Sequence, residues 1–278
     1  MVMRKLLFVF IIFLLFFDFS YGKPYEKPKV VGTIYPLYLI ARDIGGDKVE
    51  VSYLKSLAVS PHFYEVSYSD TEAIDRASVI FAVGCGIENN MKGILRKKKV
   101  VYLCEKGLRD RRDPHLWLSP TYVKQRVFNF ADALSQIDPT HSEYYRKRAW
   151  DLSMKLEKLI GIYRKRFTGK GISVIDRHGA WRYMASEVDW NYIGAIESVP
   201  HKEPTMKDME RIISRARGIK RVIVINDAGH DDSIVDRIVK KLGACKVTLY
   251  PLGKGVESSF IDLIKENLDE FEKCVTIR

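Results

Sequence analysis

Short runs of apolar, β-branched residues alternate along this chain with segments whose apolar positions recur every three or four residues. Runs of the first kind are typical of buried parallel strands, and segments of the second kind are typical of helices that cover a sheet. Strands are expected at 29–35, 49–54, 79–84, 100–104, 172–175, 191–196, 221–226 and 246–252. Helices are expected at 36–44, 69–77, 120–135, 180–188, 205–217, 233–242 and 260–272. The alternation predicts α/β architecture with parallel sheets.

A different element separates the two halves. Asp138-Pro139 suits a helix start, with Asp as N-cap and Pro at the first helical position. An apolar stripe at spacings of three and four then runs to Gly169, through Tyr145, Ala149, Leu152, Leu156, Leu159 and Tyr163. Such a helix would be roughly 45 Å long at 1.5 Å per residue. The pattern predicts two α/β lobes, residues 23–138 and 170–278, joined by one long linking helix at 139–169.

Two further helix starts are expected from their capping residues. Ser69 is a candidate N-cap, with Asp70 and Glu72 in the first turn. Thr205 is a candidate N-cap for the helix at 205–217, with Asp208 in its first turn. Hydroxyl side chains accept hydrogen bonds from the first free N–H groups, and acidic residues there interact favourably with the helix dipole.

The N-terminus has the pattern of an export signal. Arg4 and Lys5 precede a continuous apolar run at 6–17, and Ser20-Tyr21-Gly22 then offers small residues at the cleavage positions. This run is shorter than the roughly 20 residues that a membrane span needs. We expect residues 1–22 to be a signal peptide and the mature chain to be periplasmic or at the extracellular membrane surface. An uncleaved N-terminal anchor is the alternative.

The net charge is +11, and removal of residues 1–22 would lower it to +10. A strongly basic protein often binds nucleic acid or an anionic surface. Export argues against nucleic acid, so an anionic membrane face is the better partner. General solvated charge explains the composition equally well.

Four cysteines remain in the expected mature chain, and their spacing matches no zinc-finger pattern. An even number in an exported chain favours disulfides. Pairing within each half would join Cys85 to Cys104 and Cys245 to Cys274. Four buried free thiols are the alternative.

Three histidines follow predicted strands. His62 and His115 each come directly after a proline, and His178 follows the strand at 172–175. Ligands of open α/β sheets bind beyond the carboxyl ends of the strands, so the three imidazoles would meet between the lobes. Imidazole is a common ligand of transition metals, and proline stiffens the loops that carry two of these residues. Taken singly, each histidine would more often be an ordinary core or surface residue.

The residues around these histidines resemble the zinc/manganese solute-binding proteins of ABC transporters. The resemblance covers essentially the whole mature chain, and the Asp-Pro-His-X-Trp element is its most specific part. The matching segments are 31–38 with 44–51, 59–65 with Ser69-Asp70, 113–120, 178–183, 203–205, and Leu252-Gly253 with Asn267.

The resemblance implies a metal buried between the two lobes, with His62, His115 and His178 as ligands. The fourth slot falls on Ser258 by counting back from Asn267. We predict the neighbouring Glu257 instead, because a carboxylate neutralises metal charge and a hydroxyl does not. Ser258 or water are the alternatives.

The roles of other residues are less defined. Asp227 and His230 follow another predicted strand and are candidates for orienting the ligands, or they are surface polar residues. Many zinc-specific relatives have a His- and Asp-rich loop before the second ligand. Here the stretch at 105–112 is short and basic, so metal shuttling by such a loop is not expected.

Three imidazoles with one carboxylate or water suit tetrahedral Zn²⁺. Manganese members of the resembled family tend to have a carboxylate in place of the third histidine, so His178 favours zinc, with Mn²⁺ or another divalent metal as the alternative. The expected function is capture of Zn²⁺ by a monomer that delivers it to an ABC permease with a cytoplasmic ATPase. The chain itself has no phosphate-binding loop.

A secreted zinc metallohydrolase is the main competing class, because three histidines with an open position also describe catalytic zinc. A general base would then be needed near the metal. Glu65, three residues after His62, is the candidate in the first lobe, and this spacing is not a known catalytic arrangement. We therefore expect no enzyme. An adhesin or a corrinoid-binding lobe pair is a third class, and a corrinoid would not need the paired Pro-His loops.

Overall fold

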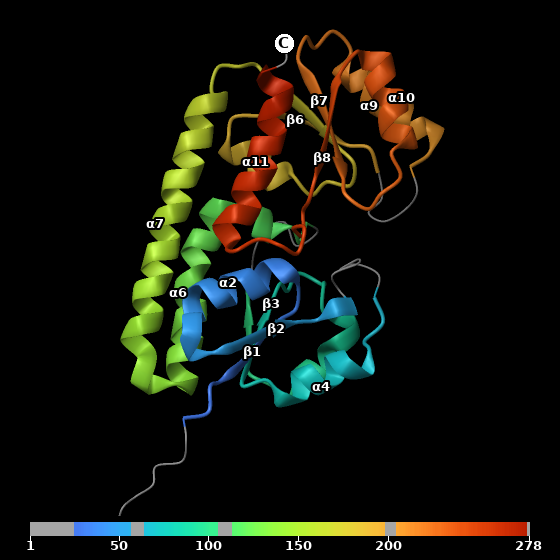
Figure 1. Ribbon diagram of the computed structural model, residues 1–278. Helices are drawn as coiled ribbons and strands as arrows, with labels where there is room; N and C mark the ends of the chain where they lie inside the picture. The colour runs from blue at the N-terminus through green and yellow to red at the C-terminus, as the bar shows by residue number, and fades with distance from the viewer. Residues whose placement is uncertain (1–24, 57–63, 105–112, 198–203, 277–278) are drawn as a thin grey trace, which may run out of the picture.

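The first lobe is built on a four-stranded parallel sheet (Figure 1). The computed structural model describes residues 25–56, 64–104, 113–197 and 204–276. The strands lie in the order β2-β1-β3-β4. Their bounds are β1 Lys29–Gly32, β2 Glu50–Tyr53, β3 Val79–Ala82 and β4 Val100–Tyr102. Val31 lies opposite Ser52 on one side and Ile80 on the other.

The second lobe repeats this topology with the strand order β6-β5-β7-β8. Its strands are β5 Ser173–Asp176, β6 Asn191–Ala195, β7 Val222–Asp227 and β8 Cys245–Leu249. In both sheets the first and third strands of the lobe are neighbours. The chain passes from the first strand to the second on one side, and the third and fourth strands are added on the other side. The carboxyl ends of the first and third strands form the switch point at which such sheets bind ligands.

Helices flank the sheets and join the lobes. They are α2 Tyr35–Gly45, α4 Tyr68–Arg76, α5 Lys92–Leu95, α6 Pro120–Ile137, α7 Ser142–Phe167, α8 Arg182–Glu187, α9 Met206–Ala216, α10 Ser233–Leu242 and α11 Phe260–Thr276. The 26-residue α7 is about 39 Å long. It lies beside α6 and α2 in the first lobe and reaches α11 in the second (Figure 1). The prediction of two parallel α/β lobes linked by one long helix is confirmed.

The helix starts show which capping predictions were right. Thr205 accepts a hydrogen bond from the Asp208 N–H, as predicted, and the Asp208 carboxylate accepts one from the Thr205 N–H. The prediction for α4 was wrong, because its N-cap is Ser67. Ser67 and Asp70 have the i, i+3 spacing of a capping box, and Ser69 does not have that spacing to Asp70.

Asp138 does not cap the long helix, contrary to the prediction. A short 3₁₀ turn at Pro139–His141 precedes α7, and the Asp138 side chain makes no capping bond to the backbone. Its Oδ2 instead accepts hydrogen bonds from the hydroxyls of Tyr25 and Tyr145 and lies 2.8 Å from His141 Nδ1. The carboxylate is thus used to join the N-terminal segment to the start of α7.

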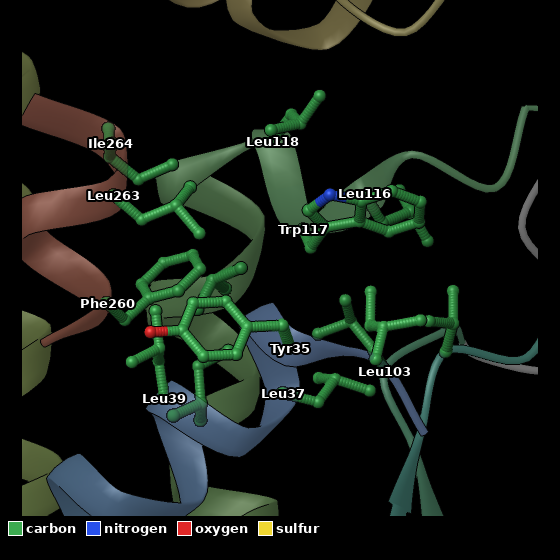
Figure 2. Close-up of a cluster of buried hydrophobic side chains, with 14 of the residues drawn as sticks. Tyr35, Leu37, Leu39, Leu103, Leu116, Trp117, Leu118, Phe260, Leu263 and Ile264 are labelled. Atoms are coloured by element: carbon green, nitrogen blue, oxygen red, sulfur yellow. The ribbon is translucent and has the colours of Figure 1, made fainter. Parts of the chain in front are cut away.

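The apolar core is divided unevenly between the lobes. One cluster of buried side chains runs through the first lobe, along α7, into α11 and onto one face of the second sheet. A smaller cluster lies between the second sheet and helices α9 and α10. Figure 2 shows Phe260, Leu263 and Ile264 of α11 facing Tyr35 and Leu39 of α2. The last helix of the chain therefore shares its core with the first lobe.

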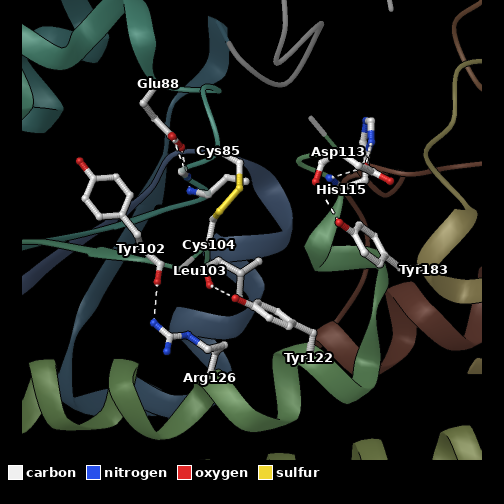
Figure 3. Close-up of a disulfide and its surroundings, with 12 residues drawn as sticks. Cys85, Glu88, Tyr102, Leu103, Cys104, Asp113, His115, Tyr122, Arg126 and Tyr183 are labelled. Carbon is white, nitrogen blue, oxygen red and sulfur yellow. Dashed lines mark hydrogen bonds and ion pairs between the residues drawn. A yellow bond between two sulfur atoms is a disulfide. The ribbon is translucent and has the colours of Figure 1, made fainter. Parts of the chain in front are cut away.

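Both predicted disulfides are present. Cys85 is bonded to Cys104 just beyond β3 and β4 (Figure 3), and Cys245 is bonded to Cys274 near the end of α11. Each bond joins residues of one lobe. None of the helices in the described part of the chain is long and apolar enough to cross a membrane; the expected signal peptide lies outside that part.

Candidate metal centre

Two imidazoles from different lobes face each other. The Nε2 atoms of His115 and His178 are 3.2 Å apart, and the ring centroids are 4.9 Å apart. Zinc–nitrogen bonds of 2.0–2.1 Å with tetrahedral angles would separate two ligand nitrogens by about 3.3 Å. The two nitrogens are therefore spaced as two ligands of one tetrahedral ion would be.

His115 is held by the first lobe and braced by the second. Asp113 Oδ1 lies 2.8 Å from His115 Nδ1 and accepts a hydrogen bond from the His115 N–H at 3.1 Å. From α8 of the second lobe, the Tyr183 hydroxyl donates to the Asp113 carbonyl at 3.2 Å, and Arg182 Nε lies 3.3 Å from Asp113 Oδ2. Figure 3 shows Tyr183 and Asp113 meeting in this way. These contacts leave Nε2 as the His115 atom that points toward His178.

His178 begins a turn that follows β5 and is organised by one buried carboxylate. Asp176 accepts hydrogen bonds from the Trp181 N–H at 3.0 Å, from the Gly179 N–H at 3.2 Å and from the Tyr192 hydroxyl at 2.8 Å. Gly179 has a φ of 93°, a conformation that favours glycine. The turn therefore fixes His178 at the carboxyl end of a central strand.

Asp227 orients the His178 ring. Its Oδ2 lies 2.6 Å from His178 Nδ1, and its Oδ1 accepts a hydrogen bond from Trp181 Nε1 at 2.8 Å. Asp227 is the last residue of β7, so it lies with His178 at the switch point of the second sheet. His230 stacks on His178 with ring centroids 5.8 Å apart. Both candidates for orienting groups thus lie against a predicted ligand.

The electrostatics differ between the two histidines. Burial lowers the pKa of His115. Burial also opposes the charge on His178, but the Asp227 carboxylate outweighs this effect and raises the pKa of His178 to about 9. Burial acts to raise the pKa of Asp227, yet the His178 charge and hydrogen bonds hold it below its usual value. A cation bound at the two Nε2 atoms would take the place of the His178 proton, so we expect binding to release protons.

The remaining predicted ligands are not brought to this pair by the described residues. His62 lies outside them. The Glu257 carboxylate accepts hydrogen bonds from the backbone N–H groups of Lys254 and Val256, at 2.6 and 3.0 Å. Over the four described ranges, no group of three or more His, Cys, Asp and Glu side chains is arranged to hold a metal ion. His62 and Glu257 therefore stay predictions as ligands.

Two carboxylates with defined parts were not singled out from the sequence. Asp113 stands two residues before His115, and Asp176 stands two residues before His178. A carboxylate at this spacing can reach back to the loop that carries the histidine, and the shared Asp-X-His pattern was the available signal. Tyr183 and Arg182 gave no such signal, because they reach Asp113 from the other lobe.

Two parallel α/β lobes, a long linking helix and imidazoles facing each other across the lobes define the class: a two-lobed solute-binding protein. The family model described as "zinc-uptake complex component A periplasmic" (ZnuA) matches residues 30–274. The chain belongs to this family.

Individual relatives are distant in sequence. The high-affinity zinc uptake system protein ZnuA of Bacillus subtilis (strain 168) is 24% identical, over 91% of this chain and 89% of the relative. The zinc-binding protein AdcA of a Streptococcus pyogenes serotype M3 strain is 26% identical over 81% of this chain, and the chain spans 50% of that protein's length.

Solved structures show the same fold. A crystal structure of ZnuA matches with a TM-score of 0.77 and 24% identity, over 88% of this chain and all but 1% of the other. The Mn-bound periplasmic metal-binding protein from Candidatus Liberibacter asiaticus matches with a TM-score of 0.77 and 18% identity, over 90% of this chain and 100% of the other. A Cd-bound structure of the same protein has a TM-score of 0.78.

Proposed function

We propose that this chain captures Zn²⁺ outside the cytoplasm and delivers it to an ABC-type permease. Membership of the family supports binding and delivery of metal. The observation that carries the choice of site is the 3.2 Å separation of the His115 and His178 Nε2 atoms, with a carboxylate on the Nδ1 atom of each ring. Carboxylate–imidazole pairs of this kind fix the tautomer and raise the basicity of a metal ligand.

We propose His62 and Glu257 as the ligands that complete the set with His115 and His178. One carboxylate would partly neutralise the charge of Zn²⁺, and three imidazoles suit this ion. Mn²⁺ prefers more oxygen ligands, so we expect weaker Mn²⁺ binding at the same place. A metal fully surrounded by side chains has no open position for substrate, which fits transport and not hydrolysis.

The partners follow from the proposed delivery step. Metal bound between the lobes must be released to a membrane permease, and a cytoplasmic ATPase supplies the energy. We propose that the chain acts as a monomer, because each ligand of the proposed set comes from the same chain. Its basic composition suits an anionic membrane face.

The experiment is a competitive zinc titration of the mature chain with a chromophoric chelator. We expect one Zn²⁺ per chain and a loss of affinity of at least about 100-fold in His115→Ala and in His178→Ala, because each variant removes a ligand. His141→Ala is the matched control, since His141 contacts Asp138 at the start of α7. Unchanged affinity in both site variants would overturn the site. Hydrolysis of ester or peptide panels by the zinc-loaded chain would favour the hydrolase.

A further inference from the structure

The loop between β8 and α11, residues 250–259, belongs to the second lobe in sequence but is bonded to the first lobe. Trp117, two residues after His115, donates from Nε1 to the Pro251 carbonyl at 2.8 Å. At the other end of the loop, the Phe260 N–H donates to Asp43 Oδ2 of α2 at 2.8 Å. Both ends of the loop are therefore fixed to elements of the first lobe.

Arg42 of α2 binds the backbone of the 250–259 loop between these two bonds. Its Nη2 donates to the Glu257 carbonyl at 3.2 Å and also to the Ser258 carbonyl. Its Nη1 donates to the Tyr38 hydroxyl at 3.2 Å, one helical turn earlier. The planar guanidinium can serve several acceptors at once, which the single ammonium of lysine does less well. Arg42 thus fixes two successive peptide carbonyls at the predicted fourth ligand.

The loop itself is tightly closed around Glu257. Glu257 is 5% exposed, and its carboxylate accepts hydrogen bonds from the N–H groups of Lys254 and Val256. Gly253 has a φ of 81°, and a Cβ there would lie 3.0 Å from Glu257 Oε1 and 3.1 Å from the Tyr35 ring. The Glu257 carboxylate therefore sits between its own loop and the start of α2, with no room for a larger residue at 253.

Apolar packing acts in the same direction. Phe260, Leu263 and Ile264 are fully buried and belong to the core cluster that includes Tyr35 and Leu39 of α2 (Figure 2). Ile175 and Val224 of the second sheet belong to the other cluster, together with α9 and α10. The first cluster also contains Val247 and Leu249 of β8, so α11 packs against both α2 of the first lobe and one face of the second sheet.

We propose that Arg42 is a positioning residue for the metal site, which holds the Glu257 loop on the first lobe. This inference rests on the proposed function, because it takes Glu257 as a ligand. Glu257 is then held against α2 of the first lobe by Arg42, in a loop whose start is bonded to Trp117, two residues after His115.

The test is a double-mutant cycle on zinc affinity. Arg42→Gln should weaken Zn²⁺ binding about tenfold, the size of one lost hydrogen bond to a charged group. In a Glu257→Gln background the same change should weaken binding less than about twofold, because there is no charged ligand left to position. The zinc affinity of Arg42→Lys should lie between the affinities of wild type and Arg42→Gln.

Arg148→Gln is the matched control. Arg148 donates from Nε to the Asp43 carbonyl at 2.8 Å, so it also joins a helix to α2 through a backbone acceptor but does not bond to the 250–259 loop. The zinc affinity of Arg148→Gln should stay within about twofold of wild type. Amide exchange in metal-free protein supplies a second measurement: the N–H groups of Lys254 and Val256 should exchange about tenfold faster in Arg42→Gln and unchanged in Arg148→Gln.

Equal effects of Arg42→Gln and Arg148→Gln would overturn the proposal, and so would an Arg42→Gln effect that persists undiminished in Glu257→Gln. Zinc binding that is lost in His115→Ala but unchanged in both Glu257→Gln and Arg42→Gln would overturn this inference and leave the proposed function standing. Zinc binding that survives His115→Ala would contradict the proposed function itself.

Discussion

Two carboxylates determine which nitrogen of each facing imidazole is available to a metal. Asp113 occupies Nδ1 of His115, and Asp227 occupies Nδ1 of His178, at 2.8 and 2.6 Å. The histidines were visible in the sequence because each follows a predicted strand. Asp227 was visible as a candidate for the same reason. The part played by Asp113 was not, because a single sequence does not show which lone pair of a ring an adjacent side chain will use.

Asp227→Asn should weaken zinc binding by about 10- to 100-fold. The amide can still accept from His178 Nδ1, but it lacks the charge that raises the basicity of the ring. Competitive titration at neutral pH measures the change, and Asp231→Asn, in the loop after the same strand, is the control. An affinity within twofold of wild type would show that Asp227 does not tune the ligand.

Asp43 should give the metal-free protein a pH-dependent stability. Burial raises the pKa of Asp43 to about 6, although the Phe260 N–H and the charges of Arg42 and Arg148 oppose this rise. Between the unfolded pKa of about 3.9 and pH 6, the folded state binds more protons than the unfolded state. Stability must therefore fall as pH rises through this window.

Asp43→Asn should remove this slope. Relative to the variant, wild type should lose up to about 3 kcal/mol between pH 4 and pH 7, from roughly two pKa units. Asp43 lines a cavity of about 320 Å³ with Arg148 and Lys155, so solvent will reduce the figure. Urea unfolding at several pH values measures it, and parallel curves for the two proteins would contradict the assignment.

At the scale of elements, local patterns located the described strands and longer helices to within a few residues, and α10 at its stated bounds. Thr205 was correctly predicted as an N-cap, and the structure shows that it forms a capping box with Asp208, three residues later. Asp138 was misread because its carboxylate bonds to Tyr25, 113 residues away. Local periodicity contains no information on such a partner, whereas the Ser69 error at α4 was a local one, because the i, i+3 spacing of Ser67 and Asp70 was overlooked.

Each disulfide should stabilise its lobe by about 3 to 4 kcal/mol, mainly by restricting the unfolded chain. The cysteines are 19 residues apart in the first lobe and 29 apart in the second. The double variants Cys85→Ser/Cys104→Ser and Cys245→Ser/Cys274→Ser should both lower the free energy of unfolding, the second slightly more because its loop is longer. Denaturant unfolding under oxidising conditions measures this. Unchanged midpoints would mean that the bonds do not restrict the unfolded state.

At the scale of the whole molecule, the sequence predicted two lobes and a linking helix but not how the lobes contact each other. The bond from Trp117 to Pro251 spans 134 residues, and the bond from Arg42 to Ser258 spans 216. Nothing in either local pattern indicates these pairs. The second lobe was predicted as one unit, 170–278, and its last helix, α11, packs against both β8 of the second sheet and α2 of the first lobe. The boundaries of the lobes stay predictions.

The position of the metal is the central claim, and a crystal structure of the zinc-loaded chain with anomalous diffraction at the zinc edge tests it most directly. We expect one strong anomalous peak between the lobes, bonded to Nε2 of both His115 and His178 at about 2.0–2.1 Å. The same map would show whether His62 and Glu257 complete the set. A single fully occupied zinc at any other place, with the two imidazoles still in contact, would contradict the account.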